Sequence, residues 1–218
     1  METTVDKKNV RDYYSVVRER RSVRHYDPSV KISREELTEM LEEAVLAPSS
    51  SNLQPWRFLV IDEQPLKEKL LPIAYNQQQV VDAAAVIAVL GDKNAYLQAD
   101  AIYQSAVDAG YMDEERKQLL VGNALRGYER IGEEGRKDVV LIDGGLVSLQ
   151  FMLSAKARGY DTVPMAGYNA QQFREAFDIP DSYATVMLIA VGKASQPGHP
   201  TTRLPIEAVT FWNRLETK

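Results

Sequence analysis

The stretch Ala47-Pro48-Ser49-Ser50-Ser51-Asn52-Leu53-Gln54-Pro55-Trp56 separates an amphipathic segment from a short apolar run. It contains three hydroxyl groups, two amides and one large aromatic ring within ten residues. Serine and asparagine are ordinary loop residues, so a plain turn explains each of them taken singly. Asn52 and Gln54 just before a buried strand are a sharper signal, because each amide offers a donor and an acceptor together. The stretch therefore suits hydrogen bonding to the polar edge of a planar heterocycle.

The segment before this stretch has the pattern of an amphipathic helix. Ser33 and Glu36 form a capping-box signature at its start. Its apolar stripe consists of Leu37, Met40, Leu41, Ala44 and Val45. We expect Pro48 to end this helix. After the stretch, Arg57–Ile61 is a short apolar run typical of a buried strand.

Elsewhere, hydrophobic periodicity predicts more helices than strands. The predicted helices run from Asp6 to Arg20, Pro65 to Ala74, Ala95 to Gly110, Asp113 to Ile131, Arg136 to Arg158 and Asn169 to Phe177. The other predicted strands are Ala83–Leu90 and Ala184–Val191, and no strand signal occurs from Lys93 to Tyr160. Many helices and few strands indicate an α+β fold. No repeat or linker interrupts the pattern, so we expect residues 1–218 to form a single domain.

The helix predicted for Arg136–Arg158 is apolar on more than one face. A helix of this kind is central to a fold or lies in an interface. Gly144 and Gly145 lie inside it, and each costs about 1 kcal/mol relative to alanine in a helix. We expect the close approach of another helix to compensate this cost.

Composition excludes several classes of function. The 218 residues carry 31 acidic and 26 basic side chains, and a net charge of -5 gives no general attraction to nucleic acid or anionic membranes. There are no cysteines and only two histidines, so thiolate chemistry is excluded and a histidine metal site is not expected. No segment approaches the roughly 18 continuous apolar residues of a membrane span. We therefore expect a cytoplasmic protein without a metal, nucleic-acid or membrane partner.

The run Arg20-Arg21-Ser22-Val23-Arg24 places three guanidinium groups and a hydroxyl within five residues. One explanation is a solvated basic end of the preceding helix, which the helix dipole favours. Another is a phosphate clamp, because arginine presents a planar fork to phosphate oxygens. A nucleic-acid patch is a third reading, although the run is short and the chain is acidic.

Three further segments are candidates for a binding site. Asn76–Gln79 offers four amides before a strand, where a solvated turn explains Gln77 and Gln78. Pro164-Met165-Ala166-Gly167 has small residues that let backbone N–H groups approach a flat ligand, unless it is a simple turn. Arg203 is a single basic residue in a loop and carries no meaning alone.

No catalytic motif accompanies these segments. The sequence lacks GxSxG, HExxH and Walker A patterns, and no GxGxxG follows a strand. The abundant carboxylates form no pattern for acid–base work. We therefore assign no catalytic residue, which is the expected situation when a cofactor carries the reaction.

Taken together, the segments resemble the FMN-dependent nitroreductase family. The five that match in order are Arg20–Arg24, Pro48–Trp56, Asn76–Asp82, Pro164–Gly167 and Arg203–Pro205. The resemblance runs from about Tyr14 to Trp212. It implies an α+β fold with a central mixed or antiparallel sheet surrounded by helices. It also implies an intertwined homodimer with FMN at the interface, each site being built from both chains.

The resemblance also implies roles for individual positions. The FMN phosphate and ribityl chain would be held by Arg20, Ser22 and Arg203, with Arg21 in the same basic run. Arg24 would lie near N1 and the C2 carbonyl of the isoalloxazine ring. Asn76 and Gln79 would reach its pyrimidine edge.

The remaining cofactor contacts would come from two segments. The partner chain would supply Pro48, Ser49, Ser50 and Asn52, with Gln54 behind them. The segment beside N5 would consist of Pro164, Met165, Ala166 and Gly167, of which the last three offer backbone N–H donors. Two positions depart from some relatives: Thr201 replaces a lysine, for which Lys193 is a candidate substitute, and Ala166 replaces an acidic residue.

The implied activity is that of an FMN-dependent oxidoreductase. NADH or NADPH would donate hydride to N5 and leave, and a nitroaromatic or quinone acceptor would then take its place in a ping-pong cycle. Reduction builds negative charge near N1, which a fixed cation such as Arg24 stabilises. Two alternatives remain: a flavin-binding carrier or sensor without a dedicated substrate, and a structural helical dimer without flavin.

Overall fold

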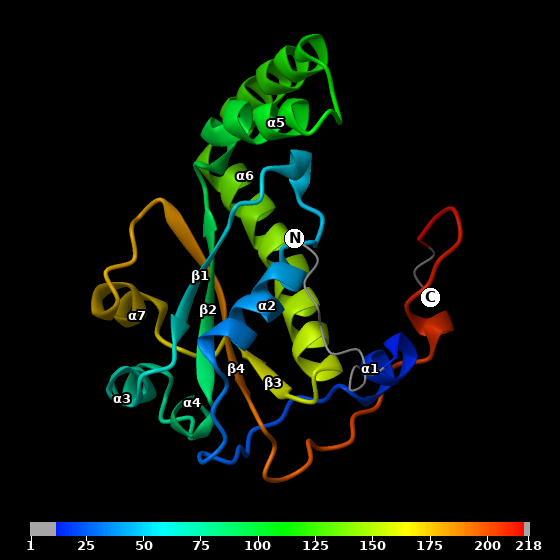
Figure 1. Cartoon of the computed structure of the whole chain (residues 1–218). Coiled ribbons are helices and arrows are strands. Elements are labelled where there is room, and N and C mark those ends of the chain that lie inside the picture. Colours follow the sequence, from blue (N-terminus) through cyan, green and yellow to red (C-terminus); the bar gives the residue numbers. More distant parts are fainter. Residues whose placement is uncertain (1–11, 216–218) are drawn as a thin grey trace.

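The computed structural model describes residues 12–215 of the chain. Its helices are α1 (Tyr13–Glu19), α2 (Arg34–Ala44), α3 (Gln64–Ile73), α4 (Gln79–Asp82), α5 (Ala99–Asp108), α6 (Glu114–Ala157) and α7 (Ala170–Ala176). Its strands are β1 (Trp56–Ile61), β2 (Ala85–Asp92), β3 (Asp161–Met165) and β4 (Tyr183–Gly192). Short 3-10 helices are η2 (Ser50–Asn52), η3 (Ala95–Gln98) and η4 (Ile206–Ala208). The helices surround one sheet (Figure 1), which confirms the predicted α+β class.

The sheet has the strand order β1-β2-β4-β3, and all three pairings are antiparallel. The only parallel pairing within residues 12–215 is an isolated bridge between Ser22 and Thr162 at the edge of β3. All eight residues of β2 are buried, as its uninterrupted apolar sequence predicts. The sheet therefore holds β2 and β4 at its centre and leaves β1 and β3 as edges.

The edge strand β3 was not predicted. Its sequence is Asp-Thr-Val-Pro-Met, which lacks the apolar run of the other strands. We interpreted Pro164–Gly167 as a segment that approaches a flat ligand, with a simple turn as the alternative. Pro164 and Met165 lie in the strand, where Pro164 pairs with Ile189. Proline lacks a backbone donor, so a sheet tolerates it at an edge. Only Ala166 and Gly167 of this candidate segment lie outside β3.

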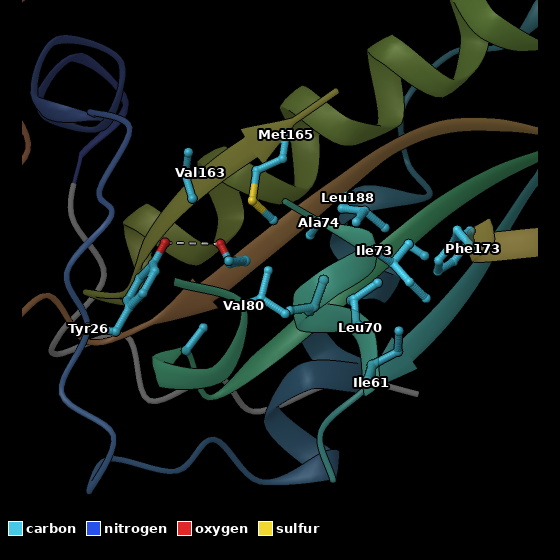
Figure 2. Packing of buried hydrophobic residues seen from close by; sticks show 14 of the residues in the cluster. Tyr26, Ile61, Leu70, Ile73, Ala74, Val80, Val163, Met165, Phe173 and Leu188 are labelled. Atoms are coloured by element: carbon cyan, nitrogen blue, oxygen red, sulfur yellow. Dashed lines mark hydrogen bonds between the residues drawn. The ribbon is translucent and has the colours of Figure 1, made fainter. Parts of the chain in front are cut away.

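Different helices cover the two faces of the sheet. On one face, α3, α4 and α7 contribute Leu70, Ile73, Val80 and Phe173 to a buried cluster (Figure 2). The buried hydroxyl of Tyr26 donates to the carbonyl of Ala190 at 3.2 Å at the margin of this cluster. On the other face, α2 and α6 pack a second cluster against the sheet. Each apolar face of the sheet is thus covered by helices.

Helix α6 has 44 residues, and it replaces the two helices predicted for 113–131 and 136–158. The break falls at Gly132, whose φ of 68° and ψ of -172° are not helical. Before the break, α6 packs against α5 in a hairpin that extends beyond the sheet (Figure 1). After it, α6 crosses the sheet face as the predicted central helix. Glycine at this position permits the positive φ at little steric cost.

The predicted partner of Gly144 was wrong. A Cβ atom at Gly144 would lie 2.5 Å from Cγ2 of Val186, so the glycine admits strand β4 rather than a helix. Gly145 has no heavy atom within 4 Å of such a Cβ in this chain. By length and composition α6 could cross a membrane, but half of its most apolar 18-residue window is buried inside the protein. That pattern is typical of a core helix.

The ends of α1 and the capping of α2 differ in detail from the prediction. Helix α1 begins at Tyr13 with Asp12 as its N-cap, and residues 6–11 of the prediction lie outside the described residues. Helix α2 ends at Ala44, before Pro48. Its N-cap Ser33 accepts from the Glu36 amide at 3.1 Å, but the Glu36 carboxylate accepts from the Tyr160 hydroxyl instead of closing the capping box.

Candidate functional site

Two arginines far apart in sequence form a cationic cluster after α1. Burial and the charges of Arg203 and Arg21 together lower the pKa of Arg20. The chain following Arg20 is fixed by the Ser22–Thr162 bridge and by a 3.1 Å hydrogen bond from the Val23 amide to the Thr162 carbonyl. The structure therefore brings Arg20 and Arg203 close together, with Ser22 beside them at the edge of β3.

The other two arginines of the run behave differently. One guanidinium nitrogen of Arg21 donates to the Arg18 and Arg20 carbonyls at 2.6 and 2.8 Å, so this side chain caps the C-terminus of α1. Arg24 is exposed. Arg21 thus fits the solvated-helix-end explanation, whereas Arg24 remains open to a ligand.

The cluster fits an anionic group. Among residues 12–215, no carboxylate forms an ion pair with Arg20, Arg24 or Arg203. Adjacent cations without a counter-ion repel each other, and burial adds a desolvation cost. A phosphate would relieve both costs through charge-assisted hydrogen bonds. The predicted substitute Lys193 donates to the Gly159 carbonyl at 3.0 Å.

The loop before β1 is held in a strained conformation. Ser51, Asn52 and Gln54 have φ values of 52°, 52° and 48°, a region that non-glycine residues rarely adopt. Such a conformation persists only where the surrounding structure imposes it, and it is concentrated at functional sites. Within the loop, the Ser49 hydroxyl accepts from the Gln54 amide at 3.0 Å, and the Gln54 side chain donates to the Asn52 carbonyl at 3.1 Å.

Side chains from helices α5 and α6 form hydrogen bonds to the backbone of this loop. The Tyr103 hydroxyl donates to the Ser51 carbonyl at 2.7 Å, and both carboxylate oxygens of Asp143 lie 3.1 Å from the Ser50 amide nitrogen. Burial raises the pKa of Asp143, while the hydrogen bond from Ser50 acts in the opposite direction. Asp143 and Tyr103 were not predicted, because both lie far in sequence from the loop that they contact.

A third group surrounds the end of β3. The Gln77 side chain donates to the Gly167 carbonyl at 2.7 Å and to the Ala74 carbonyl at 3.0 Å. The Gln79 amide donates to Gln77 at 3.0 Å and lies 3.4 Å from the Met165 sulfur. The assignment of Gln77 to a solvated turn was therefore wrong, since it fixes the segment after β3. Asn76 stays exposed with a φ of 56°.

Gln79 is buried, and its amide donors are directed inside the protein. Of the two predicted amides, Asn76 is therefore the one that is available to a ligand. Ala166 and Gly167 are exposed next to it. The structure thus joins the Asn76 segment and the predicted N5 segment into one surface.

One chain does not bring all predicted site residues together. The η2 loop lies beside the α5–α6 hairpin, whereas β3 and the segment after α1 lie at the other end of the molecule (Figure 1). The C-terminal segment extends outward on the side of α1. The group beside the hairpin, which is the first, consists of Pro48, Ser49, Ser50, Asn52 and Gln54. The second group, at the other end, consists of the arginine cluster, Asn76, Ala166 and Gly167. We call these two groups of residues half-sites, and one chain keeps them apart.

A cavity of about 530 Å³ adjoins the first half-site. The η2 loop forms one side of it, and α5 and α6 form the other. Its lining includes Tyr103, Tyr128, Met112, Leu120, Ile131 and Val139, with Arg130 and Asn123 as polar members. A mostly apolar cavity of this size suits an organic ring or chain. Within residues 12–215, no cluster of acidic and histidine side chains could hold a metal ion.

A sequence model of the nitroreductase family, called "Nitroreductase family", matches residues 17–193. The chain belongs to the nitroreductase family. It is 47% identical over 203 residues to YdgI of Bacillus subtilis, assigned as an NAD(P)H nitroreductase, covering 92% of this chain and 97% of YdgI. It is 35% identical to the CLA biosynthesis enone reductase of Lactiplantibacillus plantarum, covering 91% of this chain and 93% of that enzyme.

A solved structure agrees with this family membership. The nitroreductase from Exiguobacterium sibiricum, crystallised in complex with FMN, superposes on this fold with a TM-score of 0.90. It is 48% identical in sequence, and the match covers 94% of this chain and 99% of that chain. The family and fold implied by the five sequence segments are therefore confirmed.

Proposed function

We propose that the protein is an FMN-dependent NAD(P)H oxidoreductase that reduces nitroaromatic or quinone-type acceptors in the cytoplasm. The observation that carries the proposal is the pair of half-sites: an unpaired cationic cluster at one end and a strained amide-rich loop at the other. The first fits a phosphate and the second fits a planar heterocycle. The related FMN complex supports the choice of cofactor.

Each half-site residue has a distinct task in this proposal. Arg20, Ser22 and Arg203 bind the phosphate, and Asn76 orients the pyrimidine edge. Arg24 places a positive charge near N1. When bound, FMN would supply the hydride-transfer chemistry of the proposed ping-pong cycle between NAD(P)H and the acceptor. Reduction of a quinone or nitro group by hydride also consumes a proton, which solvent supplies in this proposal.

The proposal includes an intertwined homodimer. Helix α6 exposes Ile142, Leu146 and Leu149 at helical spacing, with exposures of 67%, 43% and 48%. The C-terminal segment adds exposed Leu204, Ile206, Val209, Phe211, Trp212 and Leu215. Apolar surface of this extent is typical of an interface. A second chain packed here supplies the η2 loop that the arginine half-site lacks.

The cavity beside the η2 loop is the proposed acceptor pocket. Its two tyrosines and aliphatic lining suit a flat, electron-poor ring. The relationship to an enone reductase favours conjugated carbonyl compounds as a second acceptor class. The alternative of a carrier or sensor remains, because it requires the same cofactor site without turnover.

The test begins with the colour of the purified protein. We expect a yellow protein that releases one FMN per chain on denaturation, identified by chromatography against FAD and riboflavin. Colourless protein or released FAD contradicts the cofactor assignment. Steady-state NAD(P)H oxidation with and without a nitroaromatic or quinone then separates the functions: acceptor-dependent turnover supports the enzyme, and its absence in yellow protein supports the carrier.

A further inference from the structure

Asp143 is a buried carboxylate in the middle of the core helix. Its exposed fraction is 3%, and the Ser50 amide is its hydrogen-bond donor, 3.1 Å from each oxygen. No described residue forms an ion pair with it, and Tyr128 on α6 is the ionisable side chain close enough to respond to its charge. Burying a carboxylate without a cation is costly. An apolar residue would pack this part of α6 at lower cost.

The carboxylate lies where the loop most needs restraint. Ser50 immediately precedes Ser51 and Asn52, the first two residues with positive φ. The Tyr103 hydroxyl fixes the next carbonyl, that of Ser51, and Tyr128 makes a long 3.5 Å contact with the Ser50 carbonyl. Asp143 differs from the two tyrosines because it accepts a hydrogen bond. No other described group accepts from the Ser50 amide.

We propose that Asp143 is a positioning residue for the cofactor loop, which holds the Ser50 peptide so that Ser49 and Asn52 are presented to FMN. The inference rests on the proposed function, because it requires that the η2 loop contacts the cofactor. Without the carboxylate, the Ser50 amide loses its buried acceptor and the loop relaxes from its strained conformation. Cofactor binding must then restore that conformation, which weakens the affinity.

The test compares Asp143→Ala with Asp143→Asn in the full-length protein. The alanine variant removes the acceptor, whereas asparagine keeps an oxygen at the same place. After removal of the cofactor, each protein is titrated with FMN by fluorescence quenching. We expect the dissociation constant to rise about tenfold or more in the alanine variant, because an unsatisfied buried donor is costly. The asparagine variant is expected to remain within about threefold of the wild type.

Two further measurements separate positioning from a general loss of stability. In the cofactor-free alanine variant, hydrogen exchange is expected to accelerate in 48–54 and to stay unchanged in the second half of α6. With saturating FMN, its kcat is expected to return to within about twofold of the wild type. Glu36→Gln is the control, because that carboxylate accepts from Tyr160 at the start of α2, outside the site.

The outcomes are distinguishable from failure of the proposed function. A wild-type protein that binds no FMN contradicts the proposed function itself. A wild type that binds FMN, together with an alanine variant of equal affinity, overturns the role of Asp143. So does an alanine variant that fails to fold, since Asp143 would then be needed for the core. Equal weakening in the asparagine and alanine variants also overturns it.

Discussion

At the scale of single residues, Arg24 and Arg203 are both exposed arginines but are expected to act on different properties of the flavin. Arg24→Ala removes a fixed charge beside the reduced ring, so the midpoint potential should fall. Loss of one such electrostatic partner costs about 2.7–4 kcal/mol, so hydride transfer should slow by about 100-fold or more. Arg203→Ala removes a cation from the cluster with Arg20. It should weaken FMN binding and leave the potential nearly unchanged.

A redox titration of both variants, each saturated with FMN, checks this division. Arg21→Ala is the matched control, because its guanidinium is occupied by the carbonyls at the end of α1. We expect the control to keep the wild-type potential. Equal potentials in the Arg24 and Arg203 variants would show that the two residues do not divide the work in this way.

The sequence indicated candidate site residues only where local chemistry is distinctive. Arginines, serines and amides at fixed offsets indicated a phosphate and a ring, and the structure brings Arg20 and Arg203 together. Nothing in the sequence indicated that the Arg21 side chain folds back and donates to carbonyls at the end of its own helix. Nor could it predict Asp143, because a lone aspartate in an apolar helix carries no local signal of the distant amide that it accepts from.

At the scale of elements, long apolar runs predicted strands β1, β2 and β4, and periodicity predicted the central helix. Strand β3 was missed because its five residues include an aspartate, a threonine and a proline. Its strand conformation is imposed by pairing with β4, which is a non-local contact. The partner of Gly144 was missed for the same reason, since a glycine indicates close approach but not which element approaches.

The close approach of α6 and β4 can be tested at Gly144. In Gly144→Ala the new methyl would lie 2.5 and 2.9 Å from the Cγ atoms of Val186, a short and stiff side chain. Overpacking of this kind costs about 1–3 kcal/mol, so the urea midpoint should fall. Gly127→Ala is the control on the same helix, because a Cβ there has nothing within 4 Å.

Glycine costs about 1 kcal/mol relative to alanine inside a helix, so the Gly127 variant should be slightly more stable than the wild type. Both variants and the wild type are unfolded at one protein concentration, since dimer stability depends on concentration. An alanine at 144 that leaves the midpoint unchanged would mean that α6 and β4 separate easily, contrary to the packing described above.

At the scale of the whole molecule, the exposed apolar stripe on α6 and the division of the site lead to one expectation. Ile142, Leu146 and Leu149 lie on one face of a helix whose opposite face packs on the sheet. A dimer formed through this stripe buries the apolar surface and joins the half-sites at once. Assembly and cofactor binding should therefore be lost together.

The double variant Ile142→Glu with Leu149→Glu tests this linkage. Two carboxylates on the stripe would have to be desolvated in the dimer, so light scattering should report a monomer at micromolar concentration. The monomer should also lose FMN, although every residue of the arginine half-site is intact. Leu66→Glu is the control, because Leu66 is partly exposed on α3, which covers the opposite face of the sheet. A monomeric double variant that keeps FMN at wild-type affinity would show that one chain forms a complete site, and the partner's loop would then have no part in binding the cofactor.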